Sequence, residues 1–341
     1  MKIIYIFNLF LVLALAGCSD SKELRLQKFL LKGNLSLKEH STEQAVYYFG
    51  EALTIDPCYG PALNNLGTLN FQAKRWEEAL PFYNRAITCH PEFISPYFNR
   101  ANTYYELKEY FNAQKDIEKI IAERPDTAVA FFMKGLVETK MRDFNGALAS
   151  FDKAISLDHV NVEYYVNHGT INYYLHKFDD AENDMKIAAS LNPREPNIYN
   201  TLSMIEISKG NLDKALTDIE KALSLSPDQP YFLNNRGYIF LMQNRLPEAL
   251  RDIDQSILLD PENGWAYRNK GIYRYLTGDY PNSVRLLKLS YSMDSFIDKI
   301  HYYLGMAYLK NDQKKEACEQ FNLSEQASDR MVPAELFKAC R

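Results

Sequence analysis

The chain has 341 residues, of which 46% are hydrophobic, and 39 Lys and Arg against 44 Asp and Glu give it a net charge of −5. This balance leaves no general basic field of the kind that attracts nucleic acid, so we expect no nucleic-acid partner. The apolar content suffices for a packed core or for a stack of packed units. No Gly/Ser-rich or Pro-rich linker interrupts the chain, which predicts one continuous architecture.

The N-terminus has the pattern of a processing segment. Lys2 precedes the apolar run Ile3–Leu13, which is too short to span a bilayer, and the residues LAGC follow at Leu15–Cys18. These four residues resemble the bacterial lipobox, whose Cys is lipidated and becomes the first residue after cleavage. The resemblance implies a signal peptide at residues 1–17, a lipidated Cys18 and a short tether over residues 18–25. The alternative is an ordinary secretory signal that contains a Cys.

The lipobox resemblance also predicts a location. The mature chain is expected to be anchored to a membrane of the bacterial cell envelope and not to span it. Ser19 follows the lipidated Cys18, which by the rule known for enteric bacteria favours the outer membrane. Five residues, Ser19–Glu23, precede the first helical pattern at Leu24, and such a tether reaches at most about 18 Å. The folded part is therefore expected to lie close to the membrane.

From residue 26 onward the chain repeats with a period of 34 residues. A first set of positions at this spacing carries small residues: Gly33, Gly67, Ala101, Gly135, Gly169, Ser203, Gly237, Gly271 and Gly305. A second set, twelve residues later, runs Ala45, Ala79, Ala113, Ala147, Ala181, Ala215, Ala249, Ser283 and Ala317. Most units end in a proline, which cannot continue a helix. Internal periods of this length are typical of helical repeat proteins.

This pattern resembles the tetratricopeptide repeat (TPR) family over residues 26–329. The resemblance implies an all-α fold, namely a right-handed α-solenoid (TPR superhelix) of about nine helix-turn-helix repeats with a capping helix at residues 330–341. The expected units are 26–59, 60–93, 94–127, 128–161, 162–195, 196–229, 230–263, 264–297 and approximately 298–331. Small residues would let the two helices of a unit approach closely, and stacking of units would build one continuous core.

The TPR resemblance also implies a binding surface. In that family one side of each first helix lines the concave face and receives peptides or partner segments. A carboxamide offers a donor and an acceptor, which match one peptide unit. Amides and rings recur on this side, and we expect them to bind protein. The expected binding residues are Asn64, Asn65, Phe98, Asn99, Asn102, Tyr105, Phe132, Asn167, Tyr173, Asn200, Asn234, Asn235, Tyr238, Trp265, Arg268, Asn269 and Tyr302.

The sequence contains no pattern that indicates catalysis, a metal or a cofactor. It has no HExxH, nucleophile elbow, phosphate-binding glycine loop or CxxC, and its six His are scattered among different units. We therefore expect neither an enzyme nor a small-molecule substrate. Cys318 and Cys340 are a candidate disulfide that would pin the capping helix, because an exported chain permits such bridges. Free, partly buried cysteines are the alternative.

Two functions follow from this reading. The first is a protein-interaction scaffold of the cell envelope that binds a peptide or protein segment in the concave groove. The second is a structural assembly factor of an outer-membrane complex that docks through its outer face, with the groove empty or filled by its own chain. Pilotins, adaptors for peptidoglycan hydrolases and barrel-assembly components share this plan, and no motif selects among them.

Overall fold

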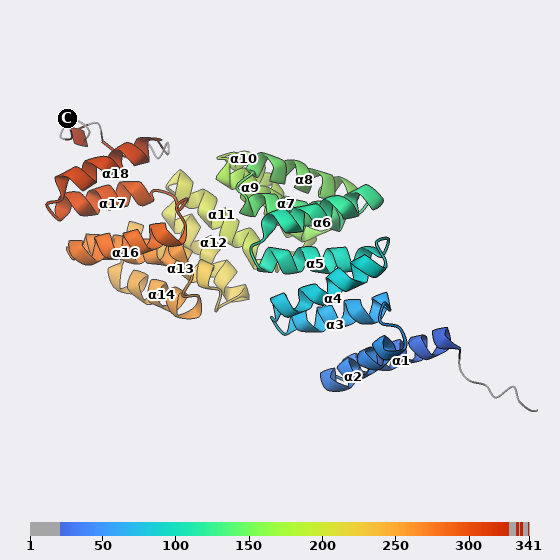
Figure 1. Cartoon of the computed structure of the whole chain (residues 1–341). Coiled ribbons are helices and arrows are strands. Elements are labelled where there is room, and N and C mark those ends of the chain that lie inside the picture. The colour runs from blue at the N-terminus through green and yellow to red at the C-terminus, as the bar shows by residue number, and fades with distance from the viewer. Residues whose placement is uncertain (1–20, 327–331, 334, 337–339, 341) are drawn as a thin grey trace, which may run out of the picture. The chain divides into compact units, whose positions relative to one another are not determined.

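The structure is a computed structural model that describes residues 21–326, 332–333, 335–336 and 340. Every element in these residues is an α-helix, and no strand occurs among them (Figure 1). Consecutive helices pack in pairs from α1·α2 to α17·α18, so the predicted all-α stack of helix-turn-helix units is confirmed. The predicted signal peptide and Cys18 lie outside the described residues, as does most of the predicted capping helix.

The chain divides into two compact units, Met1–Asp158 and His159–Arg341, which are described separately. The helices of the first unit are α1 (Lys22–Lys38), α2 (Thr42–Ile55), α3 (Gly60–Gln72), α4 (Trp76–Cys89), α5 (Ile94–Glu106), α6 (Tyr110–Glu123), α7 (Ala128–Lys140) and α8 (Phe144–Leu157). Those of the second are α9 (Val162–Tyr174), α10 (Phe178–Leu191), α11 (Pro196–Lys209), α12 (Leu212–Leu225), α13 (Pro230–Met242), α14 (Leu246–Leu259), α15 (Gly264–Leu276), α16 (Tyr280–Met293), α17 (Ile300–Lys310) and α18 (Lys314–Gln326).

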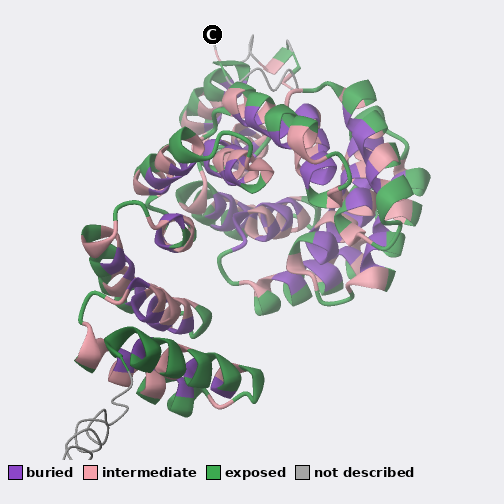
Figure 2. Cartoon of the chain, turned by 90° about the vertical axis from the view of Figure 1, so that its right-hand side faces the viewer, coloured by how far each residue is buried: buried purple, intermediate pink, exposed green. Residues whose placement is uncertain are grey.

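The small residues hold the two helices of each pair at close range. A Cβ added to Gly67 of α3 would lie 2.5 Å from the ring of Tyr83 in α4, and one added to Gly33 would lie 2.3 Å from the ring of Phe49. Ser203 replaces glycine in α11, and its hydroxyl donates to the carbonyl of Ala215 at 2.7 Å. Figure 2 shows the resulting pattern, in which the helix pairs direct their buried residues toward each other.

The turn inside each pair has one recurring conformation. A residue with a left-handed backbone stands at the same place in the repeat, at His40, Lys74, Lys108, Arg142, His176, Gly210, Asn244, Gly278 and Asp312. The amide of the residue directly before this position bonds back to the end of the first helix, as in Ala73 N–H to Leu69 O at 3.1 Å. Because the turn is constant, each second helix begins two residues after the left-handed position.

The C-terminal end is partly described. Val332, Leu336 and Cys340 pack against a buried cluster that includes Leu304 and Phe321. Among the described residues, no helix combines the length and the apolar content that crossing a bilayer requires.

Candidate functional site

Three predicted asparagines of the first unit, together with Asn34, which was not among the expected binding residues, bond to one another between successive first helices. Asn65 Nδ2 in α3 donates to Asn34 Oδ1 in α1 at 3.0 Å. Asn99 Nδ2 in α5 donates to Asn64 Oδ1 in α3 at 2.8 Å, and to Thr68 Oγ1 at 3.3 Å. These amides therefore already use donor groups to join neighbouring repeats.

The second unit repeats the arrangement. Asn235 Nδ2 in α13 donates to Asn200 Oδ1 in α11 at 2.8 Å, and Asn269 Nδ2 in α15 donates to Asn234 Oδ1 in α13 at 2.7 Å. Asn234 and Asn269 are only 2% and 0% exposed, so these two side chains are enclosed by the chain itself. We name the four amide-to-amide bonds of the two units the amide ladder. These bonds link neighbouring repeats, and the sequence positions of the asparagines alone did not indicate that role.

The remaining predicted amides do not join the ladder as donors. Asn167 Nδ2 donates to the carbonyl of Glu163 on its own helix, and Asn200 Nδ2 lies 3.6 Å from Met204 Sδ. Asn102 is exposed on α5, one helical turn beyond Phe98. Of the predicted amides, Asn102 is therefore the most accessible to a partner.

Arg268 has an unusual position for an expected contact residue, because its side chain is buried in the second unit. The guanidinium lies 4.8 Å from the ring centroids of both Tyr238 and Trp265. Its Nε and Nη2 donate to Asn269 Oδ1 at 3.0 and 2.9 Å, and Nη1 donates to the carbonyl of Asp298 at 3.0 Å. Arg268 is 3% exposed, so it connects α13, α15 and the segment before α17 and is not open to a ligand.

Other rings on the same side of the second unit are half-buried. Burial raises the pKa of Tyr173, whose hydroxyl accepts a hydrogen bond from Ser208 Oγ at 3.4 Å. Burial, together with the nearby phenol of Tyr238, raises the pKa of Tyr303, and the ring of Tyr302 packs edge-on against Tyr303 with centroids 5.2 Å apart. Of the predicted binding residues in the second unit, four are buried, namely Asn234, Tyr238, Arg268 and Asn269, and the others are half-buried.

The first unit keeps a more open set of groups. Phe98, Tyr105 and Phe132 are half-buried, and Asn102 lies exposed between the first two along α5. The ring of Tyr105 lies 5.9 Å from that of Tyr110, and Lys140 Nζ is 6.0 Å from its centroid. Burial raises the pKa of Tyr105 to about 12. We call the half-buried Asn65, Phe98, Tyr105 and Phe132, with the exposed Asn102, the inner surface of the first unit.

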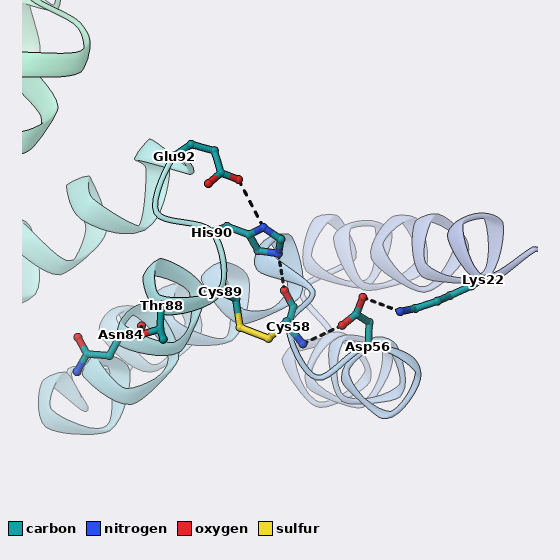
Figure 3. The surroundings of a disulfide bond; sticks show 8 residues. All are labelled: Lys22, Asp56, Cys58, Asn84, Thr88, Cys89, His90 and Glu92. Atoms are coloured by element: carbon teal, nitrogen blue, oxygen red, sulfur yellow. Dashed lines mark hydrogen bonds and ion pairs between the residues drawn. A yellow bond between two sulfur atoms is a disulfide. The ribbon is translucent and has the colours of Figure 1, made fainter.

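A disulfide that the sequence analysis did not predict joins Cys58 to Cys89, with Cα atoms 5.6 Å apart (Figure 3). Cys58 precedes α3 and Cys89 ends α4, so the bridge closes a covalent ring around one helix pair. His90 Nε2 donates to the carbonyl of Cys58 at 2.9 Å, and Asp56 Oδ1 accepts from the amide of Cys58 at 2.9 Å. A sequence signal existed, because the two cysteines are 31 residues apart, close to the 34-residue period, and so fall near the ends of successive units.

An ion pair also connects α1 to the residues that precede Cys58. Lys22 Nζ of α1 lies 2.9 Å from Asp56 Oδ2, and this contact, with the amide of Cys58, lowers the pKa of Asp56.

Cys318 and Cys340, the predicted candidate pair, are joined in the structure by a second disulfide with Cα atoms 5.5 Å apart. Both ends of the described chain thus carry a covalent cross-link.

Neither a metal site nor a catalytic arrangement emerges from these contacts. No group of three His, Cys, Asp or Glu residues converges as a metal site within the described residues. What the fold of the described residues defines is a helical repeat protein.

Sequence-family models identify the repeats. Models described as tetratricopeptide repeat match residues 30–92, 94–127 and 128–160, and a TPR repeat model matches residues 205–244. The predicted tetratricopeptide repeats are therefore confirmed, and repeats of this class serve as protein-interaction scaffolds. The matched models describe repeats and indicate no catalytic family. No curated protein sequence matches the chain.

One solved structure shows the same fold. The crystal structure of the APC/C hetero-tetramer Cut9-Hcn1 matches with a TM-score of 0.64 and 16% identity, over 94% of this chain and 64% of that chain. A tetratricopeptide repeat protein from Parabacteroides merdae has a TM-score of 0.45 and 19% identity, over 83% of this chain and 98% of its own. YrrB, a TPR protein with an unusual peptide-binding site, has a TM-score of 0.45 and 22% identity, over 54% and 95%. At these identities the likeness concerns the fold alone.

Proposed function

We propose that this chain is a lipid-anchored scaffold of the bacterial cell envelope that binds an extended protein segment on the inner surface of its first unit. One observation carries the choice of surface. In the first unit the rings of Phe98 and Tyr105 are half-buried beside the exposed amide of Asn102, whereas Arg268 and Tyr238 in the second unit are buried. A partner can contact the first set without displacing packed side chains.

The chemistry of this surface fits a peptide backbone flanked by apolar side chains. Asn102 offers a donor and an acceptor to one peptide unit, and half-buried rings supply apolar contact area with little rotamer entropy to lose. Asn65 and Asn99 bond to their neighbours through Nδ2, so the Oδ1 atom of each amide can still accept a hydrogen bond from a partner. Both oxygens belong to half-buried side chains.

The envelope location has separate support. The LAGC sequence at Leu15–Cys18 resembles a lipobox, and the chain carries two disulfides, which persist in oxidising compartments. We propose the outer membrane, with attachment through Cys18. Replacing Cys18 by Ser should abolish incorporation of radiolabelled palmitate and release the chain from the membrane fraction. Palmitate incorporation that persists in the variant would refute attachment at Cys18.

Photo-crosslinking tests the binding surface. A benzoylphenylalanine side chain introduced at Asn102 should crosslink to a partner segment in intact cells, and Asn102→Arg should reduce capture of that partner through charge and bulk. The control position is Phe111, which is 72% exposed on α6. If position 102 yields no crosslink while position 111 does, the inner surface is not the binding site.

A second candidate function is favoured by the filled inner side of the second unit. A structural assembly factor would use the outer face and keep the groove occupied by its own side chains, as Arg268, Tyr238 and Trp265 are here. A crosslink at Phe111 without one at Asn102 would support this alternative. Pilotin-like, peptidoglycan-hydrolase adaptor and barrel-assembly roles would then be the processes to examine.

A further inference from the structure

The first helix of the stack has an apolar stripe on its exposed side. Leu24, Leu31 and Leu35 of α1 are 51%, 59% and 46% exposed, and their spacing of seven and four residues places them on one face. The opposite face is the packed one, with Leu26 2% exposed and Gly33 against the ring of Phe49. Terminal repeats of a solenoid ordinarily need a polar outer face for solubility, so this stripe calls for a covering partner.

Basic side chains accompany the stripe. The helix carries five basic residues and one acidic residue in a chain whose net charge is −5. On a helical wheel Lys38 lies at one edge of the stripe, while Lys28, Lys32 and Arg25 lie at the other. Lys38, Lys28 and Arg25 are exposed, and Lys32 Nζ lies 5.3 Å from the ring centroid of Tyr48. A narrow apolar face bordered by Lys and Arg is the pattern of helices that lie in a membrane interface.

The position of Lys28 argues against a protein occupant of the stacking type. One period later the equivalent residues are Ala62, Pro96 and Ala130, all buried by the preceding helix pair. Another repeat, or a second copy of the chain stacked on α1, would have to fit the long Lys28 side chain at a place where the later repeats hold Ala or Pro. Leu35, by contrast, corresponds to Leu69 and Val137, which are buried at 7% and 1% exposure. The face therefore combines exposed leucines that need an apolar cover with a long basic side chain that a closely stacked repeat would crowd.

A lipid surface satisfies both demands, because leucines enter the acyl boundary while lysines extend to the headgroups. We propose that α1 is a membrane-contacting helix that lies on an anionic lipid surface through Leu24, Leu31 and Leu35. This contact goes beyond the proposed function and does not need the lipid at Cys18. It would hold the first unit against the bilayer and fix which of its sides is available to a partner.

Vesicle sedimentation of the full chain carrying Cys18→Ser tests the proposal. The probes are phosphatidylcholine vesicles and vesicles in which about a third of the lipid is phosphatidylglycerol. We expect Leu31→Gln/Leu35→Gln to weaken binding to the anionic vesicles at least about tenfold. Lys28→Gln/Lys38→Gln should weaken it about 30-fold, since each basic residue near such a surface contributes roughly fivefold. The matched control, Leu258→Gln/Lys288→Gln on α14 and α16, should bind like the parent.

A second measurement keeps the test independent of any change in folding. An environment-sensitive fluorophore attached through Leu35→Cys should shift to the blue with anionic vesicles, and the same fluorophore at Leu258→Cys should not. Parent and α1 variants that bind alike would overturn the proposal, as would a parent that does not bind. Two other occupants would also overturn it. If a second copy covers the stripe, the chain forms a dimer that Leu31→Gln/Leu35→Gln dissociates without changing vesicle affinity. If residues 1–20 cover it, the same two substitutions lower the melting temperature and leave vesicle affinity unchanged.

Discussion

The disulfide between Cys58 and Cys89 should contribute much of the stability of the second helix pair. The perturbation is Cys58→Ala/Cys89→Ala, which opens a ring spanning a sequence separation of 31 residues. In the chain-entropy model, closing a ring of this size lowers the entropy of the unfolded segment enough to stabilise the folded one by about 4 kcal/mol. The folded geometry should survive, because the hydrogen bonds of Cys58 to His90 and Asp56 do not involve sulfur.

Hydrogen exchange is the appropriate assay, because unfolding of a linear stack need not be a single two-state transition. Amide protection in α3 and α4 should fall in the variant, by up to about 4 kcal/mol of opening free energy. Protection in α7 and α8 should change little. The control is Cys318→Ala/Cys340→Ala, whose bridge closes a ring with a separation of 22 residues in the other unit. A loss below about 1 kcal/mol in α3 and α4 would refute the ring-closure reasoning.

Three further predictions concern packing, the amide ladder and pH. Gly67→Ala should destabilise by about 1–3 kcal/mol in urea unfolding, because its Cβ would lie 2.5 Å from the Tyr83 ring; an unchanged midpoint would contradict this. Asn269→Ala should destabilise by about 2 kcal/mol or more in the same assay, since buried Arg268 loses an acceptor; a near-neutral result would contradict that role. Burial raises the pKa of Tyr105 from 10.0 to about 12, so its contribution to stability is present below pH 10 and lost as pH rises through 12. Tyr105→Phe should therefore lose less stability than the parent between pH 9 and 12, and equal losses would contradict the assignment.

The fold was predictable because its determinants are local and periodic. Gly33 and Gly67 stand one period apart, and each faces a ring of the second helix in its own pair. Such contacts span few residues and recur, so the sequence alone indicates both the helix pairs and their close packing. The left-handed turn residue recurs as well, although it is a glycine, the residue type that adopts this backbone conformation most readily, only at Gly210 and Gly278.

The site was harder to predict because it depends on which side chains meet across repeats. Asn234 and Asn235 occupy adjacent sequence positions, yet the first is buried and bonded to Asn269 while the second is half-buried and bonded to Asn200. Helical periodicity gives the direction of a side chain, and it does not give the neighbours that enclose it. Arg268 illustrates the same limit, since its burial depends on two rings from two helices.

The constant turn makes the length of the stack adjustable in steps of one period. Removing residues 211–244 would join Gly210 to Arg245 through the same left-handed geometry. The hydroxyl of Ser203 in α11, which donates to the carbonyl of Ala215, would then meet Ala249 at the equivalent position, and Asn269 would find Asn200 at the place of its present acceptor. A chain organised this way can gain or lose a helix pair by duplication or excision while the remaining pairs keep equivalent contacts. The length of the scaffold can therefore evolve without changes to the residues that pack within each pair.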